Sequence, residues 1–216
     1  MSEPDSAEIE RARRLFAGPC EFVAGATTIE VIPPPTLPEV AFVGRSNAGK
    51  SSLINALTGR TTLARVSHTP GRTRQINFFR LADTLMLVDL PGYSYAQVSK
   101  ALAAQWQRLI FDYLRGRPNL KRVILLIDAR RGIMDVDRQA MTLLDQAAVS
   151  YLVVLTKTDK LTAAERGEAR TKTAFALKGQ VAAYPDVLAT SSLTADGLEL
   201  LRCHIAALAG TDGFGL

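Results

Sequence analysis

The fold of this chain is decided by one short stretch, GRSNAGKSS at positions 44–52: Gly44, Arg45, Ser46, Asn47, Ala48, Gly49, Lys50, Ser51 and Ser52. The pattern G-x-x-x-x-G-K-[ST] is typical of a loop whose backbone N–H groups cradle phosphates. In such a loop Lys50 would place an ammonium beside the outer phosphates, and the Ser51 hydroxyl can ligate Mg²⁺. An apolar run at 40–43 precedes the loop and a helical pattern at 52–57 follows it. We therefore predict a strand–loop–helix unit with phosphates at the helix N-terminus.

Outward from this unit, short apolar runs recur along the chain, at 76–81, 85–88, 123–127, 151–155 and 187–189. Continuous runs of this length are typical of strands buried on both faces. Helical patterns lie between them, over 102–114, from 162 onward and over 198–208. The alternation predicts an α/β fold with a mostly parallel sheet.

Composition excludes several classes of protein. The chain has 216 residues, 47% of them hydrophobic, and a net charge of +5, which is typical of a single globular domain. No apolar run approaches the roughly 18 residues that a membrane span needs, so we expect no membrane partner. The acidic N-terminus lacks the basic and apolar layout of a secretory signal, and the two cysteines, Cys20 and Cys203, cannot form a disulfide framework. We expect a cytoplasmic protein.

The domain organisation follows from a proline-rich segment at 33–38. Proline opposes regular structure there, so we expect residues 1–38 to be an N-terminal extension, partly irregular, with a short helix over 7–17. The main domain is expected to span 39–210, and a short tail 211–216.

A second motif, DLPG, follows the run at 85–88 and consists of Asp89, Leu90, Pro91 and Gly92. At the end of a buried strand, Asp89 can face the water shell of Mg²⁺ while the Gly92 N–H reaches the γ-phosphate. We predict that this loop responds to the presence of that phosphate.

A third motif, TKTD, follows the run at 151–155 and consists of Thr156, Lys157, Thr158 and Asp159. The Asp159 carboxylate can accept hydrogen bonds from guanine N1–H and the 2-amino group, whereas adenine would leave it unmatched. The Lys157 stem can lie along the base, and Ser191 and Ser192 can offer backbone N–H groups to guanine O6. The sequence therefore predicts a site for GTP and GDP.

In this order the motifs resemble those of GTPases, and more narrowly those of the EngB-type (YihA/YsxC) family of the translation-factor-related class. The matching residues are 42–55, 69–73, 77–79, 89–93, 128–130, 156–160 and 191–193. The resemblance implies a Ras-like P-loop GTPase domain with a six-stranded, mostly parallel sheet, helices on both faces, and strand 76–81 as an antiparallel edge.

The resemblance also implies site residues that no other argument provides. Thr73 would join Ser51 on Mg²⁺ when the γ-phosphate is present, and Asp89 would act through water. Lys50, Thr73 and Gly92 would be the catalytic groups at the transferred phosphate. Further nucleotide contacts are implied for Gly71, Arg72, Arg74, Gln75 and Thr190. One departure is Ser94, which stands where the family has a glycine.

Hydrolysis is expected to be slow in the isolated protein. A fast GTPase orients the attacking water with a residue just after D-x-x-G, often glutamine, and here that residue is Tyr93. Asn47 has two equal interpretations: a ligand for K⁺, as in related GTPases with asparagine at this position, or a brace for the phosphate loop.

Lys and Arg residues concentrate at 60–80 and 115–131, as in a surface that grips RNA phosphates. The resemblance implies a partner in the large ribosomal subunit or its precursor, with both rRNA and ribosomal proteins, and a role in cell division and septation. We expect a monomer. An alternative is an RNA-binding scaffold that uses GTP only as a structural ligand. A more remote alternative is an ATP-dependent P-loop kinase.

Overall fold

The computed structural model describes residues 3–61, 63, 75–93 and 100–209 of the chain. Within them, seven strands form one sheet: β1 (Cys20–Ala26), β2 (Glu39–Gly44), β3 (Ile76–Leu81), β4 (Leu85–Asp89), β5 (Leu120–Asp128), β6 (Tyr151–Thr156) and β7 (Ala183–Ala189). Their order across the sheet is β1-β3-β4-β2-β5-β6-β7. Strands β4, β2, β5, β6 and β7 run parallel, whereas β3 is antiparallel to both of its neighbours.

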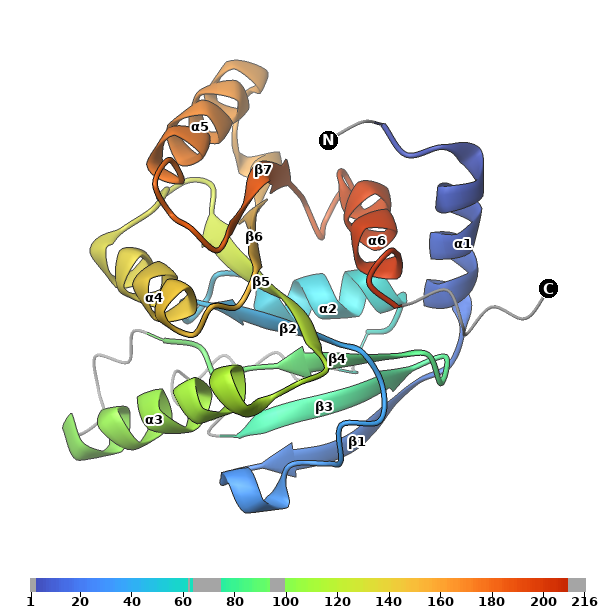
Figure 1. Cartoon of the computed structure of the whole chain (residues 1–216). Helices are drawn as coiled ribbons and strands as arrows, with labels where there is room; N and C mark the ends of the chain where they lie inside the picture. Colours follow the sequence, from blue (N-terminus) through green and yellow to red (C-terminus); the bar gives the residue numbers. More distant parts are fainter. Residues whose placement is uncertain (1–2, 62, 64–74, 94–99, 210–216) are drawn as a thin grey trace.

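Six α-helices cover the sheet in the described part of the chain: α1 (Ser6–Ala17), α2 (Lys50–Thr58), α3 (Lys100–Gly116), α4 (Asp135–Gln146), α5 (Ala163–Ala176) and α6 (Leu198–Ala206). Two 3-10 helices, η1 (Ile29–Val31) and η2 (Thr158–Lys160), lie in the connections. Helices α3, α4 and α5 cover one face, and α1, α2 and α6 cover the other (Figure 1). Each face has its own hydrophobic core, as a sheet buried on both sides requires.

The sheet confirms the expected α/β fold, with two corrections. Seven strands are present instead of six, because β1 pairs with β3 from within the N-terminal segment. Strand β3 is antiparallel as expected, but β1 takes its place as the edge. Only the two ends of β1, Cys20 and Ala26, are buried, and its register shifts between Phe22 and Ala24. The strand therefore lacks the alternation by which a sequence reveals a half-buried strand.

The helices agree with the sequence pattern except for α4, which was not expected. That helix buries only Asp137, Met141 and Leu144, so its apolar stripe is too short to stand out. Helix α5 follows residue 162, as expected, and begins with a capping box in which Thr162 and Glu165 bond reciprocally. None of the helices in the described residues is long and apolar enough to cross a membrane.

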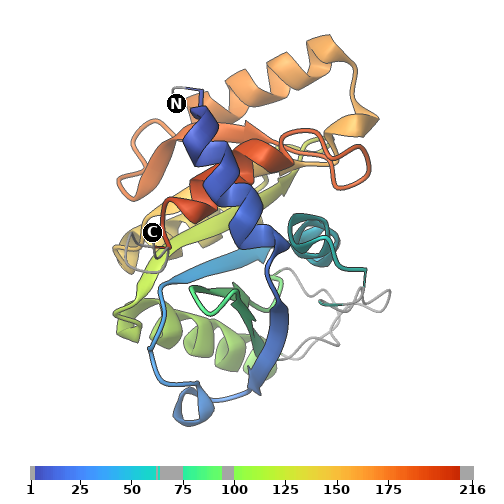
Figure 2. The same cartoon turned by 90° about the vertical axis from the view of Figure 1, so that its right-hand side faces the viewer.

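Helix α6 fixes the helix that follows the phosphate loop. The Arg202 guanidinium donates to the carbonyl oxygens of Leu57 and Ala56, both at 2.9 Å, and so caps the C-terminus of α2. The same guanidinium lies 5.7 Å from the centre of the Phe16 ring of α1, and α1 packs across α6 (Figure 2). The N-terminal helix thus supports α2 through α6.

A buried histidine lies at the opposite edge of the sheet from the carboxyl ends of the parallel strands. His204 Nε2 is 2.6 Å from the Arg122 guanidinium, which stacks 4.2 Å from the Tyr184 ring centre. Since a guanidinium only donates, Nε2 must accept, and the imidazole is neutral. Burial, followed by the charge of Arg122, lowers the pKa of His204 to about 4.

Because His204 is buried in its neutral form, we predict that the folded protein loses stability in acid. Because the folded pKa lies below the unfolded value of 6.5, the unfolded chain binds the proton first, and stability falls as the pH drops from about 6.5 toward 4. The His204→Gln variant keeps an acceptor for Arg122 and cannot titrate, so it should lose this part of the pH dependence, on the order of 1–3 kcal/mol. Urea unfolding at pH 4.5 and 7.5 measures it; parallel pH profiles of the two proteins would contradict it.

Candidate functional site

The phosphate loop leaves β2 at Gly44 and enters α2 at Lys50. Asn47 and Gly49 have positive φ, 66° and 93°, a conformation that asparagine and glycine tolerate best. At Gly44 a Cβ atom would lie 3.0 Å from the Leu126 carbonyl oxygen of β5, so close packing favours glycine there. The loop is therefore built from one packing constraint and two left-handed turns.

Lys50 and Asp89 meet at the centre of the site. The Lys50 ammonium contacts the Asp89 carboxylate at the end of β4, and their side chains are 11% and 5% exposed. Helix α2 positions the cation and strand β4 the anion. The contact brings together two residues that the sequence assigned to phosphate and Mg²⁺.

The donor set suits Mg²⁺. The Ser51 hydroxyl is a hard oxygen ligand of the kind that this ion takes, and the Asp89 carboxylate can hold a water of its shell; phosphate oxygens and further waters would fill the remaining positions. Among the described residues no three His, Cys, Asp or Glu side chains cluster as a protein-only metal cage. The residues thus fit an ion that is completed by the nucleotide; Thr73, the other expected ligand, lies outside the described residues.

The segment after Asp89 docks on the phosphate loop. Tyr93 N–H donates to the Gly44 carbonyl and the Ser46 N–H donates to the Tyr93 carbonyl, both at 3.2 Å. A Cβ on Gly92 would lie 3.1 Å from the Gly44 carbonyl oxygen, a contact so tight that a larger residue would push the segment and the loop apart. Leu90 and Pro91 are buried beneath it. Gly92 is thereby held beside the loop that cradles the phosphates.

Tyr93 is fixed by a residue that sequence reasoning missed. Its hydroxyl donates to Asp137 Oδ1 at 2.8 Å, and Arg45 Nε of the phosphate loop lies 3.3 Å from the same oxygen. Asp137 is fully buried in the first turn of α4, and burial, then its charge, raises the pKa of Tyr93 well above the usual value. The phenol stays protonated and is committed to Asp137. The one sequence feature that could have pointed to Asp137 is the pair of acidic residues in the first turn of α4, a helix that the sequence did not predict.

The loop of residues 156–159, here called the base loop, is tied to the phosphate loop by two hydrogen bonds. The Thr156 hydroxyl donates to the Ala48 carbonyl at 2.6 Å, and the Lys157 ammonium donates to the Asn47 carbonyl at 2.5 Å. Lys157 itself has a positive φ of 60°. These contacts set the distance between the predicted phosphate and base sites.

Asp159 is oriented by Ser191. The Ser191 hydroxyl donates to Asp159 Oδ1 at 2.7 Å and accepts from the N–H groups of Leu193 and Thr194, both at 3.2 Å. The bond from Ser191 is the main cause that lowers the pKa of Asp159. Buried Thr190 accepts from the Thr158 N–H at 3.3 Å, so it joins the two loops. The carboxylate is thus ionised and held in place for a base that donates hydrogen bonds.

The structure brings most of the predicted residues to one edge of the sheet. Residues 44–52, 89–92, 156–159 and 190–192 follow the carboxyl ends of β2, β4, β6 and β7. Gln75 lies apart from these contacts: its amide donates to Asn77 at 2.8 Å and packs over Gly25 of β1. Gly71, Arg72, Thr73, Arg74 and Ser94 lie outside the described residues.

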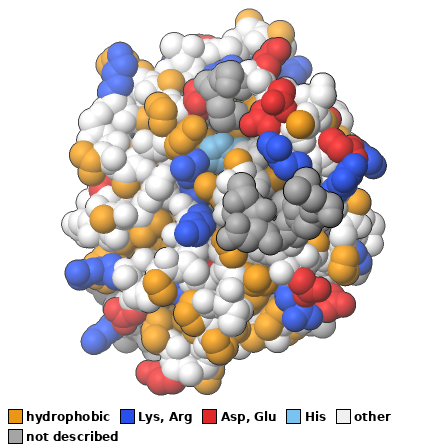
Figure 3. Space-filling view, turned by 45° about the vertical axis from the view of Figure 1, so that its right-hand side comes forward, with side chains coloured by type: hydrophobic (Ala, Val, Ile, Leu, Met, Phe, Trp, Pro, Cys, Tyr) orange, Lys and Arg blue, Asp and Glu red, His pale blue; other side chains and the backbone are white. Residues whose placement is uncertain are grey.

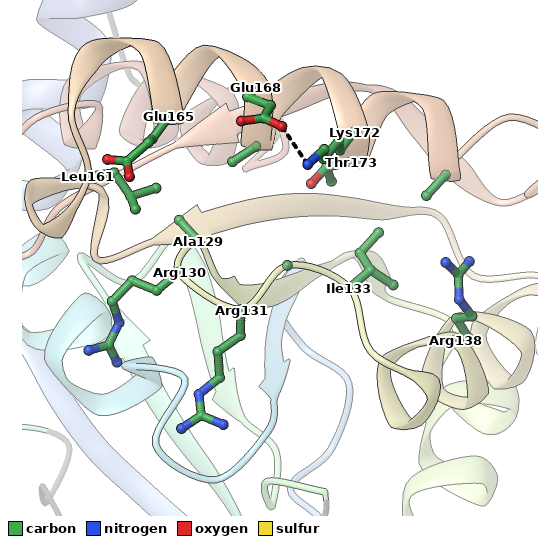
Figure 4. Close-up of a pocket in the computed structure, with 13 residues that line it drawn as sticks. Ala129, Arg130, Arg131, Ile133, Arg138, Leu161, Glu165, Glu168, Lys172 and Thr173 are labelled. Atoms are coloured by element: carbon green, nitrogen blue, oxygen red, sulfur yellow. Dashed lines mark ion pairs between the residues drawn. The ribbon is translucent and has the colours of Figure 1, made fainter.

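A cavity of about 410 Å³ lies beside this cluster, between the loop after β5 and helix α5 (Figure 4). Its acidic groups are engaged within α5: Glu168 pairs with Lys172 at 2.5 Å, and Glu165 caps the helix. None of residues 44–52, 89–92, 156–159 or 190–192 lines it. The predicted nucleotide groups therefore lie outside the cavity.

Comparison with known proteins agrees with this geometry. The sequence model of the family described as 50S ribosome-binding GTPase matches residues 39–157. The chain is 53% identical over 206 residues to the probable GTP-binding protein EngB of Cereibacter sphaeroides, covering 95% of both chains. It is 54% identical over 201 residues to the EngB protein of Caulobacter vibrioides, covering 93% of this chain and 88% of the other.

Two solved structures share the fold. A probable GTP-binding protein engB superposes with a TM-score of 0.63 at 22% identity, covering 79% of this chain and 98% of its own. Era, in complex with MgGDPNP and nucleotides 1506–1542 of 16S ribosomal RNA, has a TM-score of 0.63 at 21% identity, covering 79% of this chain and 56% of the Era chain. At these identities the likeness concerns the fold alone.

The structure combines three features of P-loop GTPases: a glycine-lined phosphate loop, a D-x-x-G segment docked on it and a T-K-x-D loop tied to it. Because the chain also matches a GTPase family, it is a P-loop GTPase. The relatives make the assignment narrower. The chain belongs to the EngB family of GTP-binding proteins.

The geometry predicts that Asp159 selects guanine. In Asp159→Asn the carboxamide can donate to the 2-carbonyl of xanthine, so binding should shift from GDP toward xanthosine diphosphate, with GDP affinity falling at least ~100-fold. Calorimetric titration with both nucleotides measures the shift. The control is Asp83→Asn on the exposed β3–β4 turn, which should match the unchanged protein. A mutant at 159 that still prefers GDP would refute the role of this carboxylate.

Proposed function

We propose that the chain is a GTP-operated switch that hydrolyses GTP slowly on its own and assists assembly of the large ribosomal subunit. The observation that supports a switch is the docking of Gly92 and Tyr93 on the phosphate loop. A γ-phosphate bound in this loop would also contact the docked segment, which could then respond to its loss. The ribosomal partner is supported by the description of the matching family, 50S ribosome-binding GTPase.

In this proposal the nucleotide is held by residues 44–52, 71–75, 89–92, 156–159 and 190–192. Mg²⁺ would be held by Ser51 and Thr73, with Asp89 acting through water, and would neutralise charge that develops on the phosphates. Lys50 supplies a second positive charge to the same oxygens, while Gly92 and Thr73 complete the contacts to the transferred phosphate. The GTPase domain would span residues 39–210, with 1–38 as an extension and 211–216 as a tail.

Slow hydrolysis follows from the environment of Tyr93. Its hydroxyl donates to Asp137 and its pKa is raised, so the neutral phenol is no base and its O–H is not available to an attacking water. The fast reaction would then need a group from a partner or a cation. This is why we expect ribosomal particles to stimulate turnover.

The partner would be the large subunit or its precursor, through rRNA, ribosomal proteins or both. On the face in Figure 3, Lys and Arg side chains lie among acidic and apolar ones rather than in one basic field, so charge on that face does not single out an RNA surface. Era, which shares the fold, was crystallised with rRNA. We further propose a cytoplasmic monomer without a membrane partner, with an associated role in cell division and septation.

Co-sedimentation with large ribosomal subunits tests the proposal. Binding should be strongest with a non-hydrolysable GTP analogue, weaker with GDP and absent in Lys50→Ala, since this lysine is needed to hold the nucleotide. Equal binding in all nucleotide states would contradict the switch. An absence of phosphate release with any ribosomal particle would instead favour the alternative, an RNA-binding scaffold that uses GTP as a structural ligand.

A second measurement concerns a monovalent cation. If the Asn47 side chain ligates K⁺, turnover should be several-fold faster in K⁺ than in Na⁺, and Asn47→Ala should remove the difference. The alternative, a bracing asparagine, is supported by the positive φ of Asn47, a conformation that asparagine tolerates better than most residues. Equal steady-state rates in the two salts would assign Asn47 to the bracing role.

A further inference from the structure

We propose that Asp128 is a positioning residue for Lys157 of the base loop, and that Arg130 holds Asp128 in the orientation that this requires. The inference rests on the proposed guanine site, and it adds two residues to that site. Asp128 ends β5 and Arg130 lies in the loop that follows it; neither belongs to the phosphate-loop, D-x-x-G or T-K-x-D motif.

Asp128 is almost completely buried and uses both carboxylate oxygens. Its Oδ2 accepts from the Lys157 ammonium at 3.0 Å and from Arg130 Nη2 at 2.7 Å. Its Oδ1 accepts from Arg130 Nε at 2.9 Å and from the Arg130 backbone N–H at 3.1 Å. The two-pronged bond from Arg130 fixes the carboxylate plane, and that plane aims Oδ2 at Lys157.

Lys157 needs such support because its backbone is unfavourable. A lysine at φ 60° lies in the left-handed region that non-glycine residues avoid. Its ammonium bridges Asp128 and the Asn47 carbonyl of the phosphate loop. The ammonium of the lysine that can cover the base is thus held by two partners, one at the end of β5 and one in the phosphate loop.

The charge of Asp128 is essential to this arrangement. Burial by itself would raise the pKa of Asp128, but hydrogen bonds from Arg130 and Lys157 outweigh it and hold the pKa below the usual value. The group therefore remains a carboxylate that only accepts. An amide in its place would turn a donor toward one of two cations, so the network cannot survive Asp128→Asn.

The chain offers a matched control for Arg130. Arg130 and Arg131 leave the same loop, and both side chains extend away from α5 (Figure 4). Arg130 is 45% exposed at its side chain and pairs with Asp128. Arg131 makes no side-chain hydrogen bond or ion pair within the part of the chain that the structure describes. The two arginines differ in this contact and share their charge and setting.

The test is the dissociation rate of a fluorescent GDP analogue from the full chain. We expect Asp128→Asn to accelerate dissociation about 10- to 100-fold and Arg130→Gln about 3- to 10-fold, because charge-assisted bonds are lost. Arg130→Lys should fall between Arg130→Gln and the unchanged protein. Arg131→Gln should remain within about twofold of the unchanged protein, whereas equal rates for the two Gln variants would overturn the role of Arg130.

A double-mutant cycle separates positioning from mere structural support. If Asp128 acts through Lys157, Asp128→Asn should have little further effect in a Lys157→Met background; a full, additive effect there would overturn the proposal. Should Asp128→Asn fail to fold, Arg130→Gln in the same background gives the equivalent reading. The ratio of GDP to inosine diphosphate affinity should stay unchanged in these variants and collapse in Asp159→Asn. A native protein that does not prefer GDP would instead contradict the guanine site itself.

Discussion

The parallel pairing of β2 with β4 on one side and β5 on the other is the constraint on which the site depends. It forces Gly44, Asp89 and Asp128 to finish at one edge of the sheet, and β6 and β7 bring their loops to the same edge. Residues that are more than a hundred positions apart thereby meet at one edge of the sheet. Ligands bind at this edge in open α/β sheets generally.

Within that edge, hydrogen bonds turn separate loops into one unit. Thr156 and Lys157 bind carbonyl oxygens of the phosphate loop, and Tyr93 pairs with that loop through its backbone. These contacts hold the three loops in fixed positions relative to one another. In the proposed switch, the same contacts would link recognition of the base to the response to the γ-phosphate.

The sequence predicted the buried core of this architecture well. Its apolar runs marked β2, β4, β5 and β6, and the spacing of G-x-x-x-x-G-K-S, D-x-x-G and T-K-x-D placed the site residues at strand ends. It missed β1, whose burial pattern does not alternate, and α4, whose buried stripe is short. Asp137 lies in α4, so sequence reasoning missed it together with that helix. The roles of Asp128 and Arg130 were also out of reach, because they depend on side-chain geometry across β5 and β6 that spacing does not encode.

The most direct test of the central claim compares two diphosphates on the unchanged protein. If Asp159, held by Ser191, faces the base of a nucleotide cradled at residues 44–52, GDP should bind at least ~1,000-fold more tightly than ADP in Mg²⁺, as measured by isothermal titration calorimetry. Comparable affinities for the two would contradict a guanine-specific site at this edge of the sheet.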